Sequence, residues 1–327
     1  MRPFHYTRAP SLSEALYLTA GENTLAIAGG TNLLDLMKLH VETPRQLADI
    51  NRLGFAAIED MDDGGLRLGA LATNTETAVH ARVRADYPVL SRAILAGATQ
   101  QLRNKATNGG NLCQRTRCFY FTNIDQPCNK REAGSGCGAI DGIAKLHAIL
   151  GTSDQCIATY PGDMAVALSA LDAKVEISGA KGERSVPVRD FHLLPGDTPW
   201  IENVLEPGEM ITGIALPAPV GGTQIYRKVR ERSSYAFALV SVAATIELTD
   251  GKFSRAELAF GGLAHKPWHD PRVGECLLGQ PPSDALFDKA ADILLEDARG
   301  YGENDFKIPL TRRTLHAVLA QATENAA

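Results

Sequence analysis

Apolar and polar positions alternate over short distances along the chain, which predicts many short helices and strands. Ser11-Leu12-Ser13-Glu14 is a capping-box pattern, so a helix is expected from there to Ala20. The apolar run 25–28 predicts a strand, and the run 33–38 predicts a helix. Between them lies Gly29-Gly30-Thr31-Asn32. This segment therefore has the order strand, glycine turn, helix.

The rest of the chain divides into two parts around an irregular segment. Strand and helix patterns occur at 46–50, 66–71, 88–98, 163–171 and 173–177, whereas 115–155 has no apolar periodicity and is rich in Gly, Cys and aromatic residues. A loop of this length inside a compact domain usually has a functional reason. After the Pro and Gly residues at 217–222, strand patterns (224–229, 238–248, 256–260) precede helical ones (284–298, 310–322). We therefore predict domains at 1–217 and 218–327.

Charge and hydropathy exclude two classes of partner. The chain has 33 Lys and Arg against 38 Asp and Glu, a net charge of -5, which disfavours a nucleic-acid binder. The longest nearly apolar stretch, 237–248, is too short for a membrane helix, so no membrane insertion is expected. No secretory signal is visible at the N-terminus. Assembly in the cytoplasm is expected, and export to the periplasm would need a partner's signal.

Cysteines are concentrated in the irregular segment. Five of the six lie between 113 and 156: Cys113, Cys118, Cys128, Cys137 and Cys156. The lack of a secretory signal disfavours disulfides, and the lack of a C-x2-C pair disfavours zinc. The long spacings suit a larger iron–sulfur cluster in a wrapping loop, with inert buried thiols as the alternative. Spacing alone leaves both interpretations open.

Two glycine pairs are candidate phosphate-binding loops. Gly29-Gly30-Thr31 and Thr107-Asn108-Gly109-Gly110-Asn111 can bring backbone N–H groups close to an anion, so together they could hold the two phosphates of one dinucleotide. Neither is a G-x-G-x-x-G or P-loop motif, which disfavours nicotinamide binding and nucleotide hydrolysis. No nucleophile motif is present, so no catalytic side chain is predicted. His265 and His269 are expected to be surface or packing residues.

Five motifs, in this order and spacing, resemble the FAD-binding subunit of the xanthine dehydrogenase and aldehyde oxidoreductase family, the molybdenum hydroxylases. They are the segments at 27–33, 103–112, 163–165 (Asp-Met-Ala), 207–209 (Pro-Gly-Glu) and 226–229 (Tyr-Arg-Lys-Val). With the cysteine-bearing insertion, the chain is most similar to the flavin subunit of bacterial periplasmic aldehyde oxidoreductases, which carries an extra 4Fe-4S cluster.

The resemblance implies an α+β fold. A PCMH/VAO-type FAD-binding domain of two subdomains would occupy 1–217, with the iron–sulfur insertion at about 113–157. A smaller C-terminal domain of the CO dehydrogenase flavoprotein type, an α/β sandwich-like sheet flanked by helices, would occupy 218–327.

The resemblance also implies the site residues, matched position by position. The cluster ligands would be Cys118, Cys128, Cys137 and Cys156, with Cys113 left out. Asn32, Asn108 and Gly162 depart from the residues common in the family. The FAD-binding residues would be Ala28, Gly29, Gly30, Thr31, Asn32, Thr107, Gly109, Gly110, Asn111, Asp163, Ile211 and Lys228.

The implied function is electron transfer. A large partner subunit with a molybdenum cofactor would oxidise an aldehyde, a small partner would pass electrons through two 2Fe-2S clusters, and FAD in this chain would deliver them to an external acceptor. One alternative is the flavin subunit of a 4-hydroxybenzoyl-CoA reductase-like enzyme. Two others are a stand-alone PCMH-type FAD oxidoreductase and a non-catalytic scaffold whose cysteines hold zinc.

Overall fold

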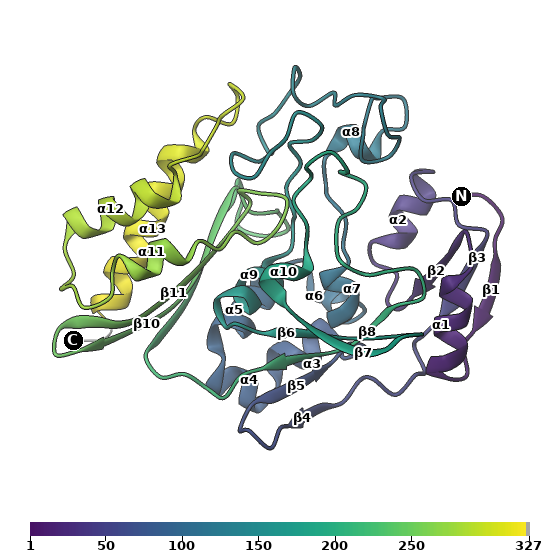
Figure 1. Ribbon diagram of the computed structural model, residues 1–327, viewed down its shortest axis with the longest axis horizontal. Helices are drawn as coiled ribbons and strands as arrows, with labels where there is room; N and C mark the ends of the chain where they lie inside the picture. Colours follow the sequence, from purple (N-terminus) through teal and green to yellow (C-terminus); the bar gives the residue numbers. More distant parts are fainter. Residues whose placement is uncertain (325–327) are drawn as a thin grey trace.

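The computed structural model describes residues 1–324; residues 325–327, the end of the predicted C-terminal domain, lie outside that range. Figure 1 shows three β-sheets arranged from right to left in chain order, with helices packed on them. The described residues include no helix that is both long and apolar enough to cross a membrane. The predicted α+β class is confirmed.

The N-terminal sheet is parallel, in the order β1 (His5–Arg8), β3 (Gln46–Asp49), β2 (Thr24–Ile27). Helices α1 (Leu12–Ala20) and α2 (Leu33–Lys38) connect its strands. The predicted cap of α1 is present, since the Ser11 hydroxyl accepts a hydrogen bond from the Glu14 N–H. The glycine turn follows β2 and leads into α2, as predicted.

A five-stranded antiparallel sheet forms the centre of the molecule. Its order is β4 (Ile58–Asp60), β5 (Leu66–Gly69), β8 (Met210–Leu216), β6 (Lys174–Gly179), β7 (Gly182–Pro187). The sequence pattern does not predict β8, because a strand buried on both faces loses its alternation of apolar and polar residues. The helices of this part are α3 (Asn74–Val79), α4 (Ala81–Asp86), α5 (Pro88–Ala96), α6 (Gln100–Arg103), α7 (Asn108–Leu112), α9 (Asp163–Ala170) and α10 (Val188–Phe191).

The C-terminal sheet is antiparallel, with β10 (Val240–Thr249) between β9 (Thr223–Val229) and β11 (Lys252–Gly261). Helices α11 (Pro271–Glu275), α12 (Asp284–Leu294) and α13 (Lys307–Glu324) cover one face, while α5 and α9 pack on the other. The predicted strand 256–260 is too short. Asp250 and Gly251, both at positive φ, form a tight hairpin that extends β11 back to Lys252.

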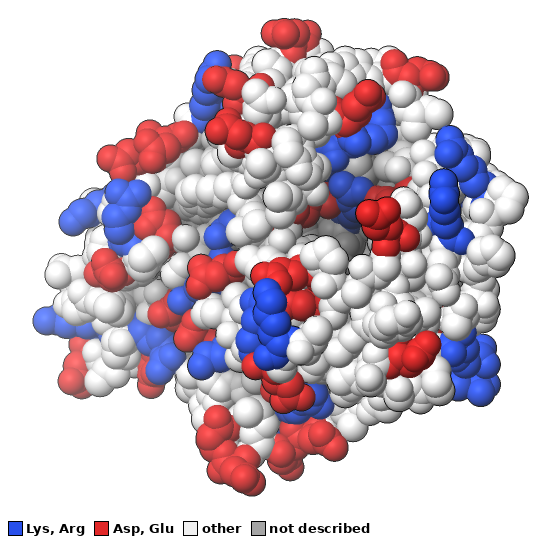
Figure 2. All heavy atoms as spheres, turned by 45° about the vertical axis from the view of Figure 1, so that its right-hand side comes forward, with Lys and Arg blue, Asp and Glu red and all other residues white. Residues whose placement is uncertain are grey.

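The cysteine segment, residues 113–162, runs over the top of the molecule between α7 and α9 (Figure 1). Within it, α8 (Phe119–Thr122) is the one helix. On the face drawn in Figure 2, basic and acidic side chains are interspersed around a central hollow.

Candidate functional site

A cleft with an open volume of about 1080 Å³ lies where the glycine turn, α7, the start of α9 and β9 meet. Apolar residues such as Ile94, Leu102 and Met164 form part of its wall. Six of the predicted FAD-binding residues line it: Thr31, Asn32, Gly110, Asn111, Asp163 and Lys228.

The first glycine turn touches the chain that precedes α7. A Cβ atom on Gly29 would lie 1.8 Å from the Lys105 carbonyl oxygen, so only glycine fits there. Gly30 has a φ of +70°, in the left-handed region. Ala28, Gly29 and Gly30 thus form the backbone of the turn whose next two residues, Thr31 and Asn32, face the cleft.

The second glycine loop is the first turn of α7. The Thr107 hydroxyl caps this helix by accepting a hydrogen bond from the Gly110 N–H, at 3.2 Å. Gly109 is buried behind the loop, where a Cβ would meet Ile211 of β8 at 3.6 Å. Asn108 is polar and fully buried, and its Nδ2 donates a hydrogen bond to the Gly69 carbonyl oxygen at 3.1 Å. This bond satisfies the buried amide.

An ion pair joins two of the predicted residues at the cleft wall. Lys228 Nζ lies 2.8 Å from Asp163 Oδ2, and both side chains are buried. The other carboxylate oxygen of Asp163 accepts a hydrogen bond from the Tyr226 hydroxyl at 2.5 Å. Asp163 also begins α9, where the helix dipole favours a carboxylate.

The chain offers hydrogen-bond donors that suit a phosphate-bearing cofactor. Asn32 Oδ1 accepts from the Arg115 N–H at 2.9 Å, while its buried Nδ2 has no partner within residues 1–324. The Asn32 amide therefore leaves a hydrogen-bond donor without a partner at the glycine turn. Among the cleft residues that the sequence did not predict, Gln114, Arg117, Tyr235 and Phe237 lie in irregular segments without a motif.

The four predicted cluster cysteines come together in space. Cys118, Cys128, Cys137 and Cys156 line one cavity of about 280 Å³, together with Asn129, Lys130 and His147. The excluded Cys113 lines a different cavity, next to His192 and Glu202. Among the described residues, no three His, Cys, Asp or Glu side chains are grouped as ligands of a single metal ion are.

The thiols of this cavity have unequal affinities for protons. A hydrogen bond between the Cys156 and Cys137 side chains lowers the pKa of Cys137 to about 6. The same hydrogen bond, together with burial, raises the pKa of Cys156. Burial raises the pKa of Cys118 to about 11. The cavity thus holds one thiol that ionises readily and two that require a positively charged ligand to do so.

Two buried histidines approach these sulfur atoms. His147 Nε2 lies 3.1 Å from Cys118 Sγ, and His265 Nε2 lies 3.9 Å from Cys156 Sγ. Burial lowers the pKa of His147 to about 4 and the pKa of His265 well below its ordinary value, so both rings are neutral at pH 7. His265 is thus a buried residue beside Cys156, a neighbour that no local sequence motif indicated.

Buried ion pairs hold the cysteine segment in place. Glu202 lies 2.6 Å from both Arg115 Nε and Lys130 Nζ, and Arg115 also contacts Glu42. Burial opposes ionisation of Glu202, but Lys130 and Arg115 outweigh it and lower the pKa of the carboxyl group. This network connects Arg115 and Lys130 of the cysteine segment to Glu42, in the loop after α2, and to Glu202, in the loop before β8.

Comparisons with known proteins agree with this architecture. The model of the FAD binding domain in molybdopterin dehydrogenase matches residues 2–219, and that of the CO dehydrogenase flavoprotein C-terminal domain matches residues 224–322. The chain is 52% identical over 328 residues to the aldehyde oxidoreductase FAD-binding subunit PaoB of Escherichia coli (strain K12), covering 100% of both chains. It is 30% identical to the glyceraldehyde dehydrogenase medium chain of Sulfolobus acidocaldarius, covering 86% of this chain and 84% of the relative.

A solved structure shows the same fold. The CO dehydrogenase from Oligotropha carboxidovorans matches with a TM-score of 0.77 at 23% identity, over 99% of both chains. The predicted PCMH-type FAD-binding domain followed by a flavoprotein C-terminal domain is therefore confirmed. Since the family models and a 52% identical relative together span the chain, it belongs to the FAD-binding subunits of the molybdenum hydroxylase family and is an oxidoreductase subunit.

Proposed function

We propose that the chain is the FAD- and 4Fe-4S-containing electron-transfer subunit of a heterotrimeric molybdenum hydroxylase that oxidises aldehydes. The observation that carries the proposal is the cleft in which both glycine loops meet the Asp163–Lys228 pair. The relative that is 52% identical is an aldehyde oxidoreductase subunit, which supports the substrate class. The domain boundary proposed at 217/218 lies close to the end of the range that the first family model matches, residues 2–219, and before the range that the second matches, residues 224–322.

The proposed FAD site divides its work between backbone and side chains. Backbone N–H groups at Gly29–Asn32 would bind the pyrophosphate, with Asn32 Nδ2 as an additional donor, while Gly110 and Asn111 of α7 would line the site. Asp163 and Lys228 would lie beside the isoalloxazine ring, while Ile211 supports Gly109 from behind. Bound FAD supplies the exchange between one-electron and two-electron steps, and the chain supplies binding and orientation.

The proposed cluster site is the cysteine cavity. It is supported by four cysteines around one cavity, in a segment held by partly buried ion pairs. A 4Fe-4S cluster holds its four thiolates on four different irons, so they need not approach one another as closely as the ligands of one zinc ion do. His147 and His265 would donate hydrogen bonds to ligand sulfur atoms.

The proposed function is tested on the complex purified through a tag on this chain. We expect one FAD per chain, iron and acid-labile sulfide beyond the amount held by the 2Fe-2S partner, and co-purification of a molybdenum-containing large subunit. Aldehyde should reduce the flavin in the complex but not in the isolated chain. Flavin reduction by aldehyde in the isolated chain would favour a stand-alone oxidoreductase, and zinc without iron would remove the cluster.

The cluster ligands are tested by serine variants. C128S and C137S should each lose the iron and sulfide of this subunit, because a serine hydroxyl is a poor ligand for iron–sulfur clusters. C113S and C276S are matched controls, since Cys113 lines another cavity and Cys276 follows α11 with its thiol donating to the Val273 carbonyl oxygen. Iron content that stays at the wild-type level in C128S and C137S would contradict the ligand assignment.

A further inference from the structure

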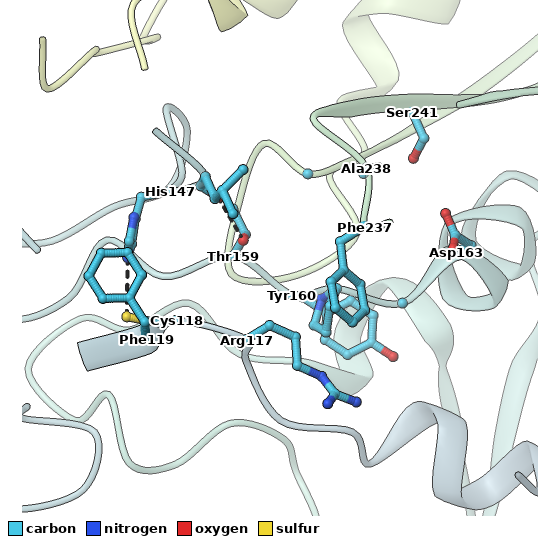
Figure 3. Close-up of a pocket in the computed structure, with 15 residues that line it drawn as sticks. Arg117, Cys118, Phe119, His147, Thr159, Tyr160, Asp163, Phe237, Ala238 and Ser241 are labelled. Carbon is cyan, nitrogen blue, oxygen red and sulfur yellow. Dashed lines mark hydrogen bonds between the residues drawn. The ribbon is translucent and has the colours of Figure 1, made fainter. Parts of the chain in front are cut away.

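Arg117 lies between the cysteine cavity and the cofactor cleft. It directly precedes Cys118, and it lines both the cleft and an adjoining cavity of about 590 Å³. Figure 3 shows this adjoining cavity, with the Arg117 side chain lying between Cys118 and the Tyr160–Phe237 side. The cysteine segment therefore contributes a cationic side chain to the wall of the cleft.

The guanidinium of Arg117 has no polar partner in the chain. Across residues 1–324 it takes part in no hydrogen bond and no ion pair, and its Nε is buried. Its one contact of note is the Phe237 ring, whose centroid lies 5.2 Å from Cζ. Arg115, two residues earlier, contacts two carboxylates. Because a partly buried cation without a counter-ion is costly, the arrangement suggests an anion that the chain itself does not provide.

The two carboxylates that line the cleft form no ion pair with Arg117. Asp163 is already paired with Lys228 and bonded to Tyr226. Asp35 of α2 lines the same cleft and attracts Arg117 electrostatically, but the two side chains form no ion pair. Arginine stays protonated even when burial disfavours its charge. The positive charge at this position is therefore permanent and faces the cleft.

We propose that Arg117 is a cofactor-binding residue whose guanidinium is the counter-ion for negative charge on the flavin dinucleotide bound in the cleft. This inference rests on the proposed function. The negative charge has two possible sources, the pyrophosphate or the ring of the two-electron-reduced flavin. In either case the segment that carries the cysteines also completes the flavin site, since the Asn32–Arg115 hydrogen bond ties it to the first glycine turn.

The test compares R117Q with R117K in the full complex and in the deflavinated full-length chain. If the partner is the pyrophosphate, R117Q should bind FAD about tenfold more weakly, because a charge-assisted hydrogen bond is lost, and its affinity for riboflavin should be unchanged. If the partner is the reduced ring, R117Q should keep its affinity for oxidised FAD, and its flavin midpoint potential should fall by about 30 mV, which is tenfold for a two-electron couple. R117K keeps the positive charge, so its FAD affinity and midpoint potential should stay close to the wild-type values.

Two controls make the result specific. R313Q removes an exposed arginine of α13 that does not line the cleft, and it should match the wild type. Iron content equal to the wild type would show that the cysteine segment of R117Q is intact. Wild-type values of FAD affinity and midpoint potential in R117Q would overturn this inference alone. A wild-type chain that binds no flavin would overturn the proposed function as well.

Discussion

At the scale of single residues, the cofactor cleft depends on charges taken out of water. Lys228 and Asp163 are only 4% and 8% exposed, and each has further polar partners, Ala96 O for the lysine and the Tyr226 hydroxyl for the aspartate. Removing one residue of such a buried pair destabilises the protein, because the other residue stays buried without its partner. An exposed pair has no comparable effect, since water solvates whichever charge remains.

K228M therefore should destabilise the protein by about 3 kcal/mol, because the Asp163 carboxyl group would stay buried beside the cleft without its cationic partner. Urea denaturation followed by circular dichroism measures this change. K181M is the matched control: Lys181 pairs with Glu206 at the surface, with side chains 85% and 59% exposed, and its loss should leave the free energy of unfolding almost unchanged. Equal effects of the two substitutions would contradict a stabilising role for the buried pair.

At the scale of elements, the cleft is formed by turns that connect short elements. The glycine turn after β2 and the residues before α7 touch backbone to backbone, and Gly110 and Asn111 of α7 line the cleft beside them. The helices that follow the two turns are short, with six residues in α2 and five in α7. Their conformation therefore depends on these contacts more than on helix propensity.

G29A should separate the two loops, because the added Cβ would overlap the Lys105 carbonyl oxygen at 1.8 Å. The expected result is loss of most bound FAD, measured by absorbance and by fluorescence of the released flavin. G221A adds a methyl group where the nearest atom is 3.7 Å away, so it should retain wild-type flavin content. Full flavin occupancy in G29A would show that the contact between the loops is not required for binding.

At the scale of the whole molecule, the cysteine segment is joined to both of its neighbours. Lys307, at the start of α13, is fully buried, and its Nζ donates to the carbonyl oxygens of His147 and Gly262 at 2.8 Å each. The Asn304 side chain makes similar contacts with His147 and Ala148. These bonds fasten the end of the segment to the C-terminal sheet and its helices.

Lys307 should make stability depend on pH. Burial lowers its pKa from 10.5 to about 7 in the folded protein, so between these values the unfolded chain binds the additional proton and the free energy of unfolding rises with pH. His147 contributes nothing in this window, because its pKa of about 4 leaves it neutral. The slope of unfolding free energy against pH, measured by urea denaturation from pH 7.5 to 10, should be smaller in K307M than in the wild type. Lys252, exposed at the start of β11, is the control, and K252M should keep the wild-type slope.

The sequence predicted the regular elements that carry a pattern or a cap. The helix after Ser11, the glycine turn and the order of strands then helices in the C-terminal part all appear in the structure. β8 was missed because it is buried on both faces, and β11 was started too late because the Asp250-Gly251 turn was not used. Local pattern thus indicated the fully buried α9 and most of β10, but it missed β8 and the largely exposed strands β1 and β7.

The sequence by itself determined the family, the glycine turns and the group of four cysteines, since each of these is written in consecutive or regularly spaced residues. Only the tertiary structure decided which side chains share a site. The pairing of Lys228 with Asp163, the approach of His147 to Cys118 and the position of Arg117 at the cleft bring together residues or surfaces that are distant along the chain or lie in irregular segments. Such contacts follow from the packing of whole elements and from the cost of burying charge, neither of which leaves a periodic trace in the sequence.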